Sequence, residues 1–351
     1  MDILISLFRS AVAFIMSCLA VISGTWFGEN NIPSLPPEDE NAQYIYFDNK
    51  LADSGSDPWV ILKDGVYYYC YSADGGVCVA KADNLPDVGN TEGVKVWTPD
   101  SEEYNQNIWA PELHYLEGKW YIYVAADDGD NANHRMLCLE GTSQDPTEPF
   151  VTKSVMRAET DRWAIDGTVM DYNGTLYFVW SGRKGCLNLV QRLYIAELEN
   201  PWTIKGDRVE ISSPSLVWEI KGGTPLINEG PTALDINGKM HIIYSASGSW
   251  SDHYCLGMLT LDGDDPLDAS NWSKSLTPVF QKSKDVFGPG HASFTTSKDA
   301  SQYFIVYHAN EESGSGWNGR SLWAQEFAID NNNDPVFGSP LPAGSMQKIK
   351  E

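Results

Sequence analysis

The chain has 351 residues, enough for one large domain or two modest ones, and it contains 30 Gly, 13 Trp and 17 Tyr. This composition is typical of a β-rich protein with many tight turns. The formal net charge of −24 argues against binding to nucleic acid or anionic membranes, because both need a basic surface that neutralises phosphate. A neutral ligand fits this charge best.

Residues 1–24 have the pattern of a secretory signal peptide. Arg9 precedes an apolar run at residues 11–22, which is short for a membrane span, and the small residues Ser23 and Gly24 follow it. An uncleaved membrane anchor is the alternative. Residues 25–43 are polar and rich in proline, so we expect an unstructured lead-in there. The sequence therefore predicts a secreted, extracellular protein that has no membrane contact once the signal is cleaved.

Five stretches of the remaining chain share one pattern: a polar or charged residue, a short apolar strand, a turn and an aromatic-rich strand. The turns include Asp64-Gly65 and Asn237-Gly238, pairs that favour the positive φ angles of tight hairpins. A repeat of about this length, built from hairpins, is typical of a β-propeller blade. We therefore predict an all-β fold, with a single five-bladed β-propeller domain over residues 44–351. The stretches are led by Asp57, Glu112, Asp166, Glu229 and His291, which stand 54 to 63 residues apart.

The five leading residues are expected to meet in one place. The first strand of each propeller blade lines the central axis, so equivalent strand starts converge on the channel. Four carboxylates and a histidine would then share a small volume, where burial and like charge raise carboxyl pKa values. A single leading Asp is more often a turn cap, but several that converge favour a functional site. Glycoside hydrolysis uses such a pair of carboxyls, one protonated for the leaving oxygen and one ionised to activate water or attack.

Five motifs stand at these positions: Asp57-Pro-Trp59, Trp109-Ala-Pro-Glu112, Ile165-Asp166-Gly-Thr168, Asn228-Glu229-Gly-Pro231 and Gly288-Pro-Gly-His291. In this order and at blade spacing, they resemble glycoside hydrolase family 43 over about residues 44–330. The resemblance implies an inverting mechanism with Asp57 as general base and Glu229 as general acid. Asp166 would orient Glu229 and raise its pKa. Inversion needs roughly 6.5–9.5 Å between the base and the acid, which leaves room for a water molecule.

The resemblance also implies roles in substrate binding. Trp109 would offer a flat face to the sugar ring, and Arg320 would reach the sugar or anchor a catalytic carboxylate. Glu112 would line the channel without a chemical step. His291 would lie low in the channel, either near the sugar with a calcium or sodium ion held through water, or hydrogen-bonded to acidic neighbours alone. No cofactor is required for this chemistry, and both interpretations of His291 stay open.

The motifs around Trp109 and Glu229, with residues 306–310, look most like secreted exo-acting α-L-arabinofuranosidases that act on α-1,5-arabinan. The resemblance thus implies release of terminal L-arabinofuranose from plant cell-wall polysaccharide, either arabinan or the side chains of arabinoxylan. A β-xylosidase, an endo-arabinanase and a carbohydrate-binding propeller without catalysis are the alternatives. The long loop at residues 311–318 is a candidate wall that would close one end of the groove and make the enzyme exo-acting.

Two acidic stretches and the cysteines are given no chemical role. Residues 127–133 lack the full liganding pattern of a calcium loop and, like residues 262–265, are interpreted as solvated loops. Five cysteines remain after the signal, an odd count without a CxxC pair, which offers no zinc site. Cys70 and Cys78 either bridge across a hairpin or pack as free thiols.

Overall fold

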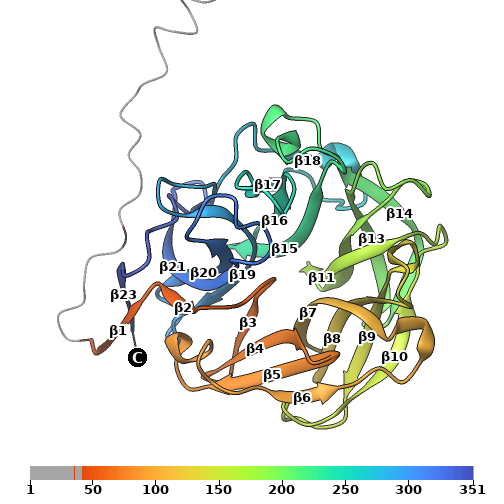
Figure 1. The fold of residues 1–351 in the computed structure, drawn as a ribbon. Coiled ribbons are helices and arrows are strands. Elements are labelled where there is room, and N and C mark those ends of the chain that lie inside the picture. The colour runs from red at the N-terminus through yellow and green to blue at the C-terminus, as the bar shows by residue number, and fades with distance from the viewer. Residues whose placement is uncertain (1–34, 36–41, 351) are drawn as a thin grey trace, which may run out of the picture. The chain divides into compact units, whose positions relative to one another are not determined.

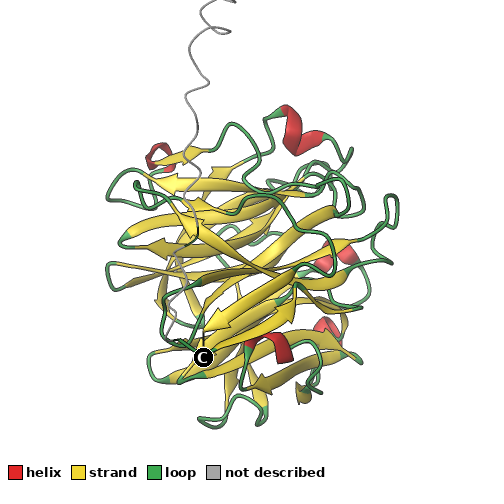
Figure 2. Cartoon of the chain, turned by 90° about the vertical axis from the view of Figure 1, so that its left-hand side faces the viewer, coloured by secondary structure: helices red, strands yellow, loops and turns green. Residues whose placement is uncertain are grey.

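The computed structural model describes Leu35 and residues 42–350. The predicted signal peptide at residues 1–24 lies outside the described residues, as does most of the predicted lead-in. Within the described part, no helix is long and apolar enough to cross a membrane. Regular structure there is β-strand, apart from short 3-10 helical turns (Figure 2). The prediction of an all-β fold is confirmed.

Five antiparallel sheets form the blades of a propeller (Figure 1). The first blade consists of β3 (Trp59–Lys63), β4 (Val66–Ala73), β5 (Gly76–Ala82) and β6 (Val94–Trp97). The second consists of β7 (Gln106–Leu116), β8 (Lys119–Asp127), β9 (Arg135–Gly141) and β10 (Phe150–Met156). The third consists of β11 (Ala164–Tyr172), β12 (Thr175–Gly182), β13 (Arg192–Asn200) and β14 (Thr203–Ser212). The fourth consists of β15 (Asn228–Ile236), β16 (Lys239–Ala246), β17 (Cys255–Leu261) and β18 (Trp272–Lys274).

The fifth blade consists of β19 (Phe287–Thr296), β20 (Tyr303–Asn310), β21 (Ser321–Ile329) and β2 (Lys50–Ala52), and β22 (Pro335–Val336) pairs with β21. The predicted single five-bladed propeller is therefore confirmed. Between the strands lie the short helices η1 (Leu85–Asp87), η2 (Glu102–Tyr104), η3 (Asn131–Asn133), η4 (Val217–Ile220) and η5 (Ala269–Asn271).

The ring is closed by both ends of the described chain. β2 comes before the first blade in sequence, but it pairs with β21 as an outer strand of the fifth blade, with Lys50 opposite Trp323. β1 (Tyr44–Asp48) pairs in turn with β23 (Met346–Lys350). The fifth blade therefore cannot separate from the first without breaking strand pairing. This closure was not predicted from the repeat, which begins only at Asp57.

The innermost strands of the blades are β3, β7, β11, β15 and β19, and neighbouring ones contact each other around the axis (Figure 1). Tight hairpins join them to the second strands. At Asn237 and Gly238 the φ angles are 53° and 84°, and at Asp64 and Gly65 they are 52° and 78°. These positive angles are the ones that Asn-Gly and Asp-Gly pairs adopt readily in type I′ turns, so the predicted hairpins are confirmed there.

Aromatic side chains fill the space between neighbouring blades. Between the second and third blades, the ring centroids of Tyr123 and Phe178 lie 5.3 Å apart, and those of Phe178 and Trp180 lie 5.7 Å apart. Gly167, which follows Asp166, lies directly against this cluster, and a Cβ atom there would come within 2.1 Å of the Phe178 ring. Glycine at this position therefore allows β11 to seat against the core.

The cysteines at residues 70, 78, 138, 186 and 255 are all free thiols. Cys70 pairs with Val79 and Cys78 pairs with Tyr71 across the hairpin of β4 and β5. Because cross-strand partners share a face and successive residues alternate, Cys70 and Cys78 point to opposite faces of the sheet. Of the two interpretations left open by the sequence, the free thiols are the correct one.

Candidate active site

A cavity of about 440 Å³ opens where the innermost strands begin, a volume within the usual range for small-molecule sites. Six of the seven site residues predicted from the sequence line it: Asp57, Trp109, Asp166, Glu229, His291 and Arg320. Glu112, the seventh, does not line it. The convergence of blade starts on one volume is therefore observed for four of the five leading residues.

The backbone at these strand starts is unusual. The φ angles of Asp57, Asp166 and His291 are 50°, 54° and 46°, in the left-handed region that residues other than glycine rarely adopt. Strand register also shifts just after Ile165 in β11 and just after Glu229 in β15. Such bulges turn side chains out of the regular alternation, and each strained residue costs on the order of 1–3 kcal/mol. The fold retains this strain where the acidic side chains turn toward the cavity.

Asp57 is surrounded by cationic and imidazole groups. Arg320 donates from Nη1 to Asp57 Oδ1 at 3.2 Å, and Nδ1 of His291 lies 3.2 Å from the same oxygen. The backbone N–H of Asp57 donates to Nδ1 of His308 at 3.0 Å. Burial alone would raise the pKa of Asp57, but His291, His308 and Arg320 together hold it well below its usual range. Asp57 is therefore an ionised carboxylate at neutral pH.

Glu229 is in the opposite state. The hydroxyl of Tyr254 donates to Glu229 Oε1 at 2.9 Å. Burial, and then repulsion by the nearby charge of Asp166, raise the pKa of Glu229 to about 8. Glu229 is therefore largely protonated at neutral pH and carries a proton that can be donated.

Asp166 is tied to the backbone beside Glu229. Its Oδ2 accepts a hydrogen bond of 3.0 Å from the N–H of Gly230, the residue after Glu229. Burial raises the pKa of Asp166 to about 6, against the opposing effects of His291 and of the Gly230 hydrogen bond. Asp166 and Glu229 therefore act on each other's protonation, and Asp166 is the one that ionises first.

His291 is held by the fourth blade and by the acids around it. Its backbone N–H donates to Ser245 Oγ at 2.8 Å. Burial lowers the pKa of His291, but the charges of Asp57 and Asp166 outweigh it and raise the pKa to about 10. The imidazolium is thus an internal counter-ion for the acids. Among the described residues there is no group of three or more His, Cys, Asp or Glu placed to hold a metal ion, and the channel ion stays a prediction.

Glu112 is not among the residues that line the cavity and is only 4% exposed. Its Oε2 lies 2.9 Å from Nε2 of His114. Burial raises the pKa of Glu112 well above its usual range and lowers that of His114 to about 3, so burial disfavours the charged form of each group. The register of β7 shifts between Trp109 and Glu112, and in this blade it is Trp109 that reaches the cavity. Glu112 therefore does not line this cavity, although the charges of Asp166 and His291 act on its pKa, and its proposed place in the substrate channel stays a prediction.

Several cavity residues were not predicted from the sequence. Among them are Asn131, Asn188, Gln191 and Trp317. Asn131 lies in the acidic stretch 127–133, whose first residue, Asp127, is fully buried. The interpretation of that stretch as a solvated loop is therefore wrong for Asp127. Its acidic and amide composition does not distinguish a solvated loop from one folded against a pocket.

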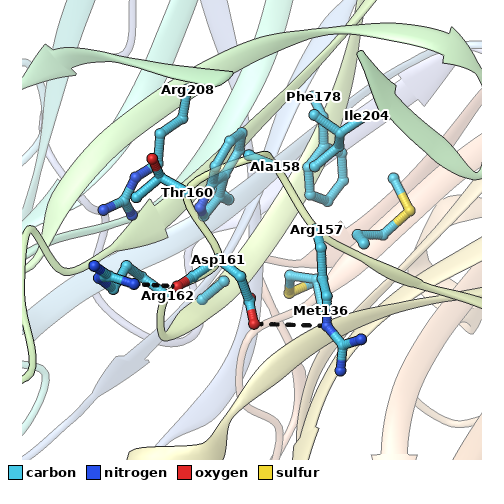
Figure 3. Close-up of a pocket in the computed structure, with 12 residues that line it drawn as sticks. Met136, Arg157, Ala158, Thr160, Asp161, Arg162, Phe178, Ile204 and Arg208 are labelled. Carbon is cyan, nitrogen blue, oxygen red and sulfur yellow. Dashed lines mark hydrogen bonds and ion pairs between the residues drawn. The ribbon is translucent and has the colours of Figure 1, made fainter. Parts of the chain in front are cut away.

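A second cavity lies between the second and third blades and has a volume of about 10 Å³. Figure 3 shows side chains that line it, among them Asp161, whose carboxylate pairs with Arg157 and whose backbone carbonyl accepts a hydrogen bond from Arg162. This space holds about one water molecule and is too small for a sugar. The larger cavity is therefore the candidate active site.

A family model described as "Glycosyl hydrolases family 43" matches residues 50–335. The chain belongs to glycosyl hydrolase family 43. The resemblance found in the five motifs is therefore confirmed.

Two named proteins and one solved structure illustrate what this chain is similar to. The "Extracellular exo-alpha-(1->5)-L-arabinofuranosidase" of Streptomyces avermitilis is 34% identical over 86% of this chain and 65% of its own length. "Alpha-L-arabinofuranosidase 43" of Humicola insolens is 33% identical, over 86% of this chain and again 65% of its own length. The crystal structure of an α-L-arabinofuranosidase from Lactobacillus brevis superposes with a TM-score of 0.77 at 33% identity, covering 85% of this chain and 96% of that one. The chain thus spans 65%, just under two thirds, of the length of these two relatives.

Proposed function

We propose that this family 43 protein is a glycoside hydrolase that releases terminal L-arabinofuranose from α-1,5-arabinan or arabino-oligosaccharides with inversion. One observation carries the proposal: Asp57, Asp166 and Glu229 line one cavity of sugar size while their surroundings set different protonation states. A binding-only propeller has no need for that arrangement. The choice of L-arabinofuranose as the sugar rests on the names of the similar proteins, which are arabinofuranosidases.

In the proposed mechanism the two differently protonated carboxyls act at the same moment. Asp57 accepts a proton from a water molecule, whose oxygen attacks the anomeric carbon of the arabinose. Glu229 gives its proton to the departing glycosidic oxygen as the C–O bond breaks. The net proton moves from water to the leaving alcohol, and exchange with solvent resets both carboxyls. Attack from the face opposite the leaving group inverts the anomeric configuration.

Asp166 has the proposed role of holding and tuning the acid. Its charge raises the pKa of Glu229, and its hydrogen bond to the N–H of Gly230 fixes the chain at the acid. Arg320 and His291 have the matching role for the base, since both contact Asp57 Oδ1. The acid and the base are thus each oriented by groups that also set their protonation.

Exo action is supported by the loop at residues 311–318. This loop is anchored to the fourth blade, because Asp252 accepts hydrogen bonds from Ser313 Oγ and from the N–H of Gly314. Trp317 donates from Nε1 to Ser249 Oγ at 3.0 Å and packs edge-on against Trp250, with 6.1 Å between ring centroids. Both tryptophans line the cavity, so a fixed aromatic wall borders it on this side.

The proposed setting is outside the cell, on plant cell-wall polysaccharide. Two Streptomyces relatives are named as extracellular enzymes, and residues 1–24 have the signal-peptide pattern. The net charge of −24 suits a neutral arabinan or the arabinose side chains of arabinoxylan. No cofactor is proposed for the reaction, and a calcium or sodium ion near His291 would have a structural role.

Product analysis on linear α-1,5-arabinan tests the proposal, with wild type compared to Glu229→Gln. Arabinose as the only early product, lost in the variant, is expected. Proton NMR of the first product anomer gives the stereochemistry, and retention would refute the roles of Asp57 and Glu229. Longer oligosaccharides would indicate an endo-arabinanase. Cleavage of xylo-oligosaccharides in place of arabinan would indicate a β-xylosidase.

A further inference from the structure

Trp109 stands in the most distorted part of its strand. It is 37% exposed and lines the cavity. The register of β7 shifts on both sides of it, between Gln106 and Trp109 and again between Trp109 and Glu112. Asn107 and Ala110, which flank it, have φ angles of 46° and 44°. Such strain persists only where surrounding contacts over-determine the conformation, so something must hold this segment.

A buried pair of side chains lies behind Trp109. The imidazole of His134 stacks against the indole, with 4.1 Å between ring centroids and 28° between planes. Nδ1 of His134 lies 2.8 Å from Asp127 Oδ2, and both side chains are fully buried. Neither residue lines the cavity. Neither takes part in the hydrogen bonds described above for Asp57, Asp166 and Glu229.

Asp127 and His134 also form hydrogen bonds with Asn107, the residue with a left-handed backbone that precedes Trp109 by two positions. Asn107 donates from Nδ2 to both carboxylate oxygens of Asp127, at 2.9 and 3.0 Å. The carbonyl oxygen of Asn107 lies 2.9 Å from Nε2 of His134. Asp127 also accepts from the N–H of Gly129 at 2.8 Å, which fixes the start of the loop. The left-handed residue is thus held from both its side chain and its carbonyl.

The pair also reaches a second cavity residue, Asn131. Its Oδ1 lies 3.1 Å from Nδ1 of His134 and accepts from Trp163 Nε1 at 3.2 Å. Trp163 Nε1 also donates to the backbone carbonyl of Asn131 at 2.7 Å, whereas the described hydrogen bonds include none from the amide nitrogen of Asn131, which can therefore donate to a ligand in the cavity that Asn131 lines. A sugar hydroxyl is the natural acceptor for such a donor.

We propose that Asp127 and His134 are positioning residues that hold Trp109 and Asn131 as a binding platform for an arabinosyl unit; the sugar assignment rests on the function proposed above. The support is geometric. The contacts require an N–H on Nε2 of His134 that donates to the Asn107 carbonyl, and a proton between Nδ1 of His134 and the carboxylate of Asp127. Burial lowers the pKa of His134, whereas the hydrogen bond to the Asn107 carbonyl and the charge of Asp127 oppose that shift.

The kinetic test compares four variants: His134→Gln, Trp109→Ala, the double variant, and the control His241→Gln. His241 is also fully buried and bonded at both nitrogens, to Thr260 Oγ1 and the Asn333 carbonyl, but it lies outside the cavity. We expect His134→Gln to raise KM for arabinotriose about tenfold with kcat changed less than about twofold, because platform contacts contribute to binding. His241→Gln should leave both constants unchanged.

The double variant separates positioning from general damage. If His134 acts through Trp109, its replacement in the Trp109→Ala background should raise KM by less than about twofold more. Fully multiplicative effects, or an unchanged KM in His134→Gln, would overturn the proposal.

A crystal structure of His134→Gln gives a readout that does not depend on the substrate. Displacement or disorder of Trp109 and Asn131 is expected, and an unmoved indole would overturn the positioning role. If wild type releases no arabinose from any substrate, the proposed function fails, and this structure still decides whether the pair positions the platform.

Discussion

The hydroxyl of Tyr254 donates a hydrogen bond of 2.9 Å to Oε1 of Glu229, the residue assigned as general acid. Tyr254 is buried and its ring stacks on His308, with 5.6 Å between centroids and 3° between planes. His308 in turn accepts the backbone N–H of Asp57, the assigned base. One buried stack, whose two members do not line the cavity, therefore connects Glu229 to Asp57 through hydrogen bonds at both of its ends.

The pH dependence of kcat/KM should be bell-shaped, because Glu229 must be protonated and Asp57 ionised. The pKa of Glu229 is raised to about 8, so activity should fall as pH rises through about 8. The pKa of Asp57 is held well below its usual range, so activity should persist well below pH 5 before it falls. Initial rates at low substrate concentration from pH 3 to 10 test this. An alkaline limb near pH 5 would contradict the protonated state of Glu229.

Replacement of Tyr254 by Phe should move the alkaline limb to higher pH. The lost hydrogen bond stabilises the charged form of Glu229, so its removal raises the pKa further. Because orientation of the acid is also lost, kcat should fall, by about tenfold on the scale of one active-site hydrogen bond. Phenylalanine keeps the stacked ring on His308, so the thermal midpoint of unfolding should stay close to that of the wild type and serves as the control. A limb that moves to lower pH would exclude this role for Tyr254.

Replacement of Asp166 by Asn should move the alkaline limb in the opposite direction. The charge of Asp166 raises the pKa of Glu229, so its removal lets Glu229 ionise at lower pH. We expect kcat/KM at pH 7 to fall by about 10²-fold or more, as when general-acid catalysis is impaired. The same pH series measures this. An unchanged profile would remove Asp166 from the tuning role.

Replacement of Gly167 by Ala should destabilise the fold without touching a charged group. The new Cβ would meet the Phe178 ring at 2.1 Å, and overpacking of this kind costs about 1–3 kcal/mol of unfolding free energy. Urea denaturation at pH 7 measures the loss. Gly185→Ala is the matched control, because no atom lies within 4 Å of its Cβ position, and it should change stability by less than about 0.5 kcal/mol. Equal stability of both variants would contradict the packing role of Gly167.

The chain's own pattern was enough for the architecture and for the convergence of three acids on one cavity. Turn pairs such as Asn237-Gly238 act locally, through the φ angles that their residues tolerate, so they are readable without the fold. The hairpin unit recurs five times, which implied five blades. Because Asp57, Asp166 and Glu229 stand at equivalent positions of their blades, they were expected to meet at the central axis. All three line one cavity, as that equivalence requires.

What tertiary structure decided were the departures from the repeat. Two bulges in β7 bring Trp109 to the cavity in place of Glu112, and bulges depend on pairing that a single strand does not encode. Asp127 looked like a loop carboxylate but is buried against His134, a contact visible only once β8 and η3 are folded together. The closure of the ring by β2 joins residues more than 260 positions apart in sequence. The conformation of a turn depends on neighbouring residues and can be predicted from them. The burial of a side chain and the register of a strand depend on residues far apart in the sequence, which come into contact only when the chain folds.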